Sequence, residues 1–235
     1  MIREDGLPTR RQLTRRSLVQ AVKELANADP ALAASVKRYG APPLWAREPS
    51  YATLIHLILE QQVSLASARA AFDRLNAALG GNIRPQRFLT LSDSALRTMG
   101  FSRQKARYAR DLAIALTDGF DLDGLAHQPD DEVRASLTRL RGIGRWTADI
   151  YLIMCLRRPD VWPHGDQALA TAARELLELP TRPSFDELEL RARSWRPHRA
   201  TAARIPVAPL PVGPRPHVNA ASCVCPLNAR LGGRP

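Results

Sequence analysis

The stretch that decides the fold runs from Leu137 to Asp166 and reads LTRLRGIGRWTADIYLIMCLRRPDVWPHGD. Its Gly-Ile-Gly turn predicts two helices joined at a tight corner, because Gly142 and Gly144 tolerate positive φ and admit another chain closely. The helix that opens at Arg145 offers unsatisfied amides and a positive dipole end, which attract an anion. Such a helix-hairpin-helix grips a DNA phosphate without reading bases. A bare Gly-Ile-Gly turn can also be a simple packing corner, but the apolar residues on both sides favour DNA binding.

Asp166 ends this stretch, and two roles are open for it. The expected helix 145–157 is about 20 Å long, and the segment 158–165 reaches back about 26 Å when it is extended. Asp166 can therefore return beside the hairpin. Position alone favours a simpler role, because Asp is a preferred N-cap and a helix is expected to follow it.

The rest of the chain is also expected to be helical, so the predicted fold class is all-α. Apolar residues recur with helical spacing, and no segment alternates with period two. The segment 51–62 is apolar nearly all round, which is typical of a buried central helix. Gly80 and Gly81 should end the next helix. The expected helices begin at Ser17, Pro30, Tyr51, Ser64, Ser92, Ser102, Pro129, Arg145, Asp166 and Ser184.

The charge of the chain predicts a polyanionic partner. Lys and Arg number 34 against 23 Asp and Glu, which gives +11, and only three of the 34 are lysines. The planar guanidinium matches phosphate, so nucleic acid is the first expectation and an anionic membrane the second. A GC-rich genome that writes Arg for Lys would explain part of the excess. We expect no transmembrane helix, because no apolar run is long enough, and no membrane partner, because no basic amphipathic helix with an aromatic face stands out. We also expect no signal peptide, and therefore a cytoplasmic protein.

The number and spacing of the cysteines limit which metal cofactors the chain could bind. The three cysteines are Cys155, Cys223 and Cys225. An iron–sulfur cluster needs four thiolates, so we expect none. The Cys-x-Cys pair near the C-terminus has no second pair to complete a zinc site.

Several motifs of the chain resemble those of a known family. The run L-x-G-I-G-R-W-T-A at 140–148, followed by P-x-G-D at 163–166, is similar to the helix-hairpin-helix (HhH-GPD) DNA glycosylases. The segment 58–64, ILEQQVS, matches the central helix of that family and its turn toward DNA. The segment 100–106, GFSRQKA, matches another family stretch and has the G-h-x-R-x-x-A spacing of residues 142–148, which favours a second hairpin; coincidence explains this echo nearly as well. The nearest type is DNA-3-methyladenine glycosylase II in its compact form.

The resemblance implies a monofunctional glycosylase of base excision repair. Its substrate would be double-stranded DNA containing alkylated purines such as 3-methyladenine and 7-methylguanine, which leave the stack for a pocket. The carboxylate of Asp166 would stabilise the oxocarbenium-like sugar and orient water. Lyase members carry a lysine where this chain has Trp146, so no strand cleavage is expected. We expect a monomer. Two alternatives stay open: a related glycosylase for mismatched or deaminated bases, and a non-catalytic DNA-binding module in which Asp166 is only a cap.

The resemblance also assigns site residues by position. The base pocket would be lined by Trp146, Tyr151, Trp162 and His198, although a buried aromatic is usually core. DNA contacts would come from Gln61, Gln62, Gly142, Ile143, Gly144 and Arg145. Either glutamine would be the wedge, meaning the residue that fills the gap left by the displaced base, with Gln62 the better match. A monovalent cation, Na⁺ or K⁺, would sit on the backbone carbonyls of Thr138, Leu140 and Ile143.

Three segments are expected. Residues 1–45 would hold N-terminal helices and a linker, and residues 46–204 the helix-hairpin-helix glycosylase domain. Residues 205–235 contain seven prolines and no Asp, Glu or Lys, which predicts an irregular tail. Two origins are open for that tail: a natural disordered basic extension, or a shifted reading frame in GC-rich DNA.

Overall fold

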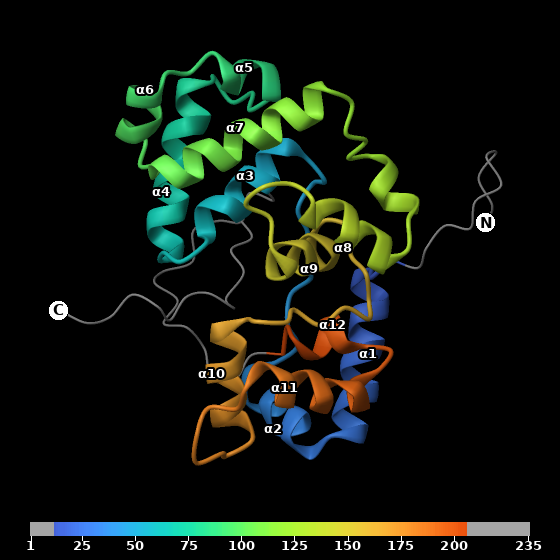
Figure 1. Cartoon of the computed structure of the whole chain (residues 1–235). Helices are drawn as coiled ribbons and strands as arrows, with labels where there is room; N and C mark the ends of the chain where they lie inside the picture. The colour runs from blue at the N-terminus through green and yellow to red at the C-terminus, as the bar shows by residue number, and fades with distance from the viewer. Residues whose placement is uncertain (1–11, 206–235) are drawn as a thin grey trace. The chain divides into compact units, whose positions relative to one another are not determined.

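The computed structural model describes residues 12–205, and within them it is helical with no strand (Figure 1). The predicted all-α class is confirmed. The chain divides into two compact units, and the boundary falls inside one helix, after Tyr151. The described part of the first unit comprises residues 48–151, and that of the second comprises residues 12–47 and 152–205.

The first unit is organised around a buried helix. Eight of the ten residues of α3 are buried, as its uniformly apolar sequence predicts. It packs against α4 and α7, and α7 packs in turn against α5 and α6. The helices of this unit are α3 (Tyr51–Glu60), α4 (Leu65–Ala78), α5 (Pro85–Leu89), α6 (Asp93–Thr98), α7 (Arg103–Thr117), the 3-10 turn η1 (Gly124–His127), α8 (Asp130–Thr138) and the start of α9 (Arg145–Met154).

The second unit joins the two ends of the described chain. Helix α1 contacts α2 and α12, and α2 contacts α10. Its core holds Leu25 and Leu32 from the N-terminal helices beside Trp162, Leu169 and Trp195. The helices of this unit are α1 (Arg15–Ala28), α2 (Pro30–Tyr39), α10 (Gln167–Leu176), α11 (Phe185–Ala192), the 3-10 turn η2 (Arg193–Trp195) and α12 (Arg199–Ala202).

The boundaries of these two units differ from those of the segments expected from the sequence. The N-terminal helices do not form a separate piece before residue 46, because their apolar faces are buried against residues 152–205. Residues 206–235 lie outside the described residues, and with them the question of the tail's origin and the pair Cys223 and Cys225.

Side-chain caps set most of the helix starts. The hydroxyl groups of Ser64, Ser92 and Ser102 each accept a backbone N–H in the first turn of the following helix, which confirms the expected starts. The first helix differs from the expectation: Thr14 is its N-cap, and Ser17 is the partner in a capping box. The predicted capping box at Ser184 is present.

None of the helices between residues 12 and 205 combines the length and the apolar composition that a bilayer-spanning segment needs.

Candidate functional site

The Gly-Ile-Gly turn joins α8 to α9 as a tight hairpin, as predicted. Ile143 N donates to Leu140 O at 3.1 Å, and Gly142 has φ +85°. A Cβ on Gly142 would lie closer than 3 Å to the ring of Tyr108 on α7. Glycine is therefore required twice here, by the left-handed backbone and by the packing of the hairpin against α7.

The start of α9 is suited to an anion. Ala148 N donates to Gly144 O at 3.0 Å, so Gly144 occupies the N-cap position. A glycine brings no side-chain oxygen to the first-turn amides, unlike the serine before α7. A Cβ on Gly144 would meet nothing within 4 Å. The space beside Gly144 is thus open at the positive end of the helix, where an anion is favoured.

The two candidate wedge residues have different surroundings. Gln61 Nε2 donates to Gly142 O at 2.8 Å and to Thr147 Oγ1 at 3.1 Å, so its amide ties the end of α3 to the hairpin. Gln62 is exposed and has φ +55°. Of the pair, Gln62 is the one whose side chain is exposed.

Lys105, from the echo segment 100–106, also contacts the turn at Gln61 and Gln62. Its Nζ donates to Leu59 O and to Gln61 O, each at 2.7 Å. Burial lowers the pKa of this amine. Two carbonyls at the C-terminal end of α3 therefore fix the lysine, which gives the echo segment a structural role that spacing alone did not reveal.

Helix α9 carries a buried carboxylate that the sequence did not lead us to expect. Asp149 has 0% exposure, and its Oδ1 accepts from Arg134 Nε at 2.8 Å. Its Oδ2 lies 3.8 Å from Nε of Arg145, the predicted DNA-contacting residue. Burial alone would lower the pKa of Arg134, but Asp149 and Asp131 raise it overall. A lone Asp within the apolar run ADIYLIM was the available signal.

Asp166 is the N-cap of α10 in the second unit. Its Oδ1 accepts from Leu169 N at 2.8 Å, and its residue exposure is 2%. The predicted cap is therefore confirmed. A catalytic role and a place beside the hairpin stay predictions, because the hairpin belongs to the first unit.

The predicted pocket residues divide between the units. Trp146 is half-buried and Tyr151 fully buried, both in the first unit. Trp162 is buried in the same unit as Asp166, with its ring 5.5 Å from that of Trp195. His198 also lies there, with Nε2 2.6 Å from Glu24 Oε2.

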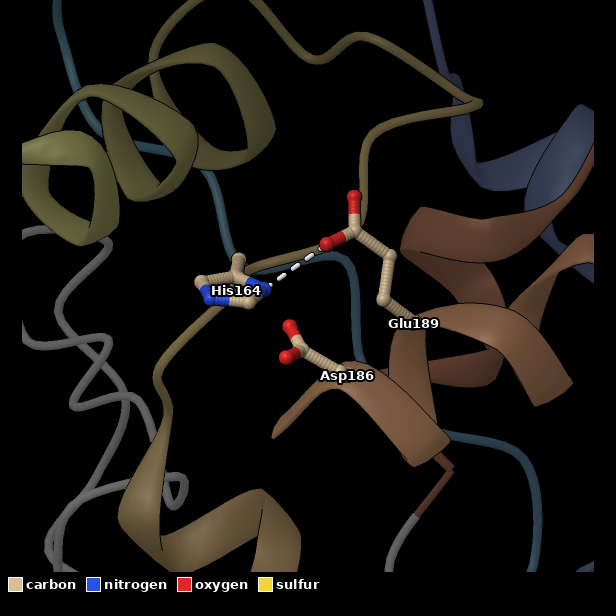
Figure 2. Close-up of side chains that lie close together, drawn as sticks. All are labelled: His164, Asp186 and Glu189. Carbon is tan, nitrogen blue, oxygen red and sulfur yellow. Dashed lines mark ion pairs between the residues drawn. The ribbon is translucent and has the colours of Figure 1, made fainter. Parts of the chain in front are cut away.

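The loop before Asp166 is tied to α11 by an ion pair. Figure 2 shows His164 pointing toward Glu189, with Nδ1 2.7 Å from Oε2, and Asp186 close by on the same helix. One candidate ligand atom from each of the three lies within 4.8 Å of the other two. The ion pair accounts for this arrangement, and its position two residues before Asp166 helps to fix the loop.

Comparison with known proteins identifies the relatives of this chain. A family model described as HhH-GPD superfamily base excision DNA repair protein matches residues 55–197. A Bacillus subtilis protein, YfjP, is 27% identical over 180 residues, which are 73% of this chain and 63% of YfjP. DNA-3-methyladenine glycosylase 1 of Schizosaccharomyces pombe is 29% identical over 161 residues, 67% of this chain and 70% of that protein.

A solved structure shares the fold. The Schizosaccharomyces pombe 3-methyladenine DNA glycosylase Mag1, in complex with abasic DNA, superposes with a TM-score of 0.74 at 28% sequence identity. The match covers 79% of this chain and 94% of that one. The hairpin, the turn at Gln61 and Gln62, and Asp166 all lie within the residues that the family model matches.

Proposed function

Because the chain belongs to the HhH-GPD superfamily of base excision DNA repair proteins, we propose that it is a monofunctional DNA glycosylase. It hydrolyses the N-glycosidic bond of alkylated purines such as 3-methyladenine and 7-methylguanine. The observation that carries the proposal is the hairpin at 142–144, in which Gly142 is required by φ and packing and Gly144, at the helix start, leaves the space beside it open to a phosphate.

DNA is held without regard to sequence. The hairpin amides contact a backbone phosphate, and Arg145 adds positive charge at the same helix start. Gln62, at the exposed turn beside the hairpin, enters the duplex when the base is displaced. Gln61 does not enter DNA in this proposal, because its amide already joins the turn to Gly142 O and Thr147 Oγ1.

Asp166 supplies the charge for bond cleavage. The bond between the sugar C1′ and the base nitrogen breaks, and its electron pair leaves with the base. The carboxylate stabilises the cationic sugar and orients the attacking water, whose oxygen forms the new bond to C1′ and whose proton is released to solvent. Its bond from Leu169 N fixes the orientation of the group. An alkylated purine is already cationic, so it is a good leaving group and needs no strong general acid.

The base pocket is proposed around the aromatic residues near Asp166. Trp162 offers a rigid face of the kind that attracts a cationic base by stacking. His198, of the same unit, is proposed to complete the lining, whereas Trp146 and Tyr151 belong to the first unit and stay predictions from the family resemblance. His198 enters only when its contact with Glu24 opens, because the ring nitrogen is otherwise engaged.

We propose that the hairpin carbonyls hold a monovalent cation. Thr138, Leu140 and Ile143 offer backbone oxygens, which are the ligands that hard cations prefer. Leu140 O accepts one hydrogen bond from Ile143 N and keeps a second lone pair. Na⁺ or K⁺ held there would strengthen the attraction of the hairpin for a phosphate. We further propose that the protein acts as a monomer and works in the cytoplasm, where bacterial chromosomal DNA is accessible.

The competing function is a DNA-binding module without catalysis. The observation in its favour is that Asp166 already has a complete structural role as an N-cap. A third candidate is a glycosylase for mismatched or deaminated bases.

One experiment separates these functions. Duplex DNA methylated with dimethyl sulfate is incubated with the protein, and released bases are resolved by liquid chromatography. We expect free 7-methylguanine and 3-methyladenine, with none from unmethylated DNA. Release only from duplexes containing hypoxanthine, uracil or a mismatch would replace the substrate class. Tight DNA binding with no base released from any substrate would support the module.

A further inference from the structure

An arginine-lined cavity lies between α6 and α7 in the first unit. Its volume is about 360 Å³. Its lining residues are Asp93, Arg97, Arg103, Ala106, Arg107 and Arg110. Four arginines and one carboxylate therefore line the same cavity.

Only one of the four arginines is neutralised. Arg110 Nη2 donates to Asp93 Oδ1 at 2.8 Å and to Leu91 O at 2.6 Å. Arg97, Arg103 and Arg107 are exposed, and no carboxylate of residues 12–205 forms an ion pair with them. The cavity thus gathers positive charge that the described fold leaves uncompensated.

The chemistry of the lining selects for phosphate. Guanidinium groups bind phosphate through paired N–H donors, and several in one cavity can hold more than one phosphate oxygen. The amides of α7 contribute less, because Ser102 Oγ already accepts from Lys105 N at 3.2 Å. The side chains, and not the helix end, make this surface attractive to an anion.

Helix α7 also links the cavity to the DNA-binding elements. Its Lys105 donates to Gln61 O beside the wedge, and its Tyr108 packs against Gly142 of the hairpin. Arg103 and Tyr108 are about 7.5 Å apart along the helix axis, and at 3.6 residues per turn the cavity arginines of α7 lie on the face of that helix opposite to Lys105 and Tyr108. Duplex DNA carries one phosphate per about 1.7 Å of its axis. A duplex seated on the hairpin therefore carries further phosphates beyond that contact, and the cavity would take one whose strand passes the start of α7.

We propose that this arginine cavity is a second phosphate-binding site, which takes the DNA backbone flanking the phosphate held by the hairpin. The inference rests on the proposed function only in taking DNA as the polyanion. It does not depend on Asp166 or on any damaged base, so undamaged duplex should occupy the cavity equally well.

The test compares two pairs of arginine substitutions in the same unit. Arg103→Ala with Arg107→Ala removes two cavity charges. Arg84→Ala with Arg87→Ala removes two exposed charges outside the cavity, around the start of α5. Binding of the full-length protein to an undamaged fluorescent duplex is followed by anisotropy at several salt concentrations.

We expect the cavity pair to weaken binding roughly tenfold and to flatten the slope of log affinity against log salt by about 2, one for each phosphate that the variant no longer neutralises. The control pair should change affinity less than about twofold, because general attraction between distant charges is screened. Replacing both cavity arginines by lysine should restore most of the affinity, and thermal unfolding of each variant verifies the fold.

Equal effects of the two pairs would overturn the inference, and so would a salt slope that the cavity pair leaves unchanged. A different result would refute the proposed function. If the wild-type protein released no base from methylated DNA while the cavity pair still bound more weakly, the glycosylase proposal would fall and the phosphate site would stand.

Discussion

Replacing Asp166 with Asn should separate its structural role from its chemical one. Asn caps helices as well as Asp does, so the bond from Leu169 N at 2.8 Å should survive. Losing the charge at the helix start costs about 0.3–1 kcal/mol of stability. Removing a charge aimed at the transition state typically costs 10²–10³-fold in rate, roughly 2.7–4 kcal/mol. The increase in the activation free energy of base release should therefore be several times larger than the decrease in the free energy of unfolding.

The assay is single-turnover release of 7-methylguanine from methylated duplex, with thermal unfolding and DNA anisotropy measured on the same samples. Ser184→Ala is the matched control, because it removes a cap in the same unit at a cost of about 1 kcal/mol without touching a proposed reacting group. That control should keep nearly full base release. If Asp166→Asn kept its rate within fivefold of wild type, Asp166 would be only a cap and the mechanism would be refuted.

Three further outcomes are expected. Gly142→Ala should lower the free energy of unfolding by at least about 1–2 kcal/mol, because it forces a side chain into the left-handed region and against Tyr108. Gly144→Ala should unfold like wild type but bind every duplex more weakly. A loss of affinity that depended on the DNA sequence would contradict the proposed role of the hairpin. Borohydride should trap no protein–DNA adduct and the product should be intact abasic DNA, because Trp146 has no amine; an adduct would show lyase chemistry. Hydrogen bonds from the backbone N–H and the hydroxyl of Ser184 lower the pKa of Glu187, so the part of the Ser184→Ala stability loss that comes from the lost hydroxyl–carboxylate bond should disappear as pH falls through the lowered pKa. The part that comes from the lost cap of Glu187 N should persist in acid, and a stability difference that does not shrink at all on acidification would refute this.

Local chemistry made much of the fold predictable from the sequence. Serine hydroxyls before α4, α6, α7 and α11 cap their helices, and this signal requires only the first turn of each helix. The buried character of α3 followed from its composition. In contrast, α5 spans five residues and is too short to show a period; it forms around the buried Phe88.

The parts of the site that sequence reasoning missed depend on distant partners. Gln61 bonds to a carbonyl 81 residues away, and His198 contacts an acid 174 residues away. No local pattern predicts which of two adjacent glutamines turns inward. Asp149 is a different case, because a single acid in an apolar helix was a local signal that the sequence analysis did not use, and only its partner, Arg134, required the fold.

The left-handed backbone at Gln62 restricts what evolution can place there. With φ at +55°, a β-branched side chain would clash with its own backbone, whereas Gly, Asn and unbranched residues fit more easily. A saturation library at this codon, selected for survival under a methylating drug, should therefore lose Val, Ile and Thr early. An apolar plug could arise there only as Leu, Met or another side chain without a second substituent on Cβ. The repertoire of this position is thus set by the geometry of a turn as much as by the DNA that it meets.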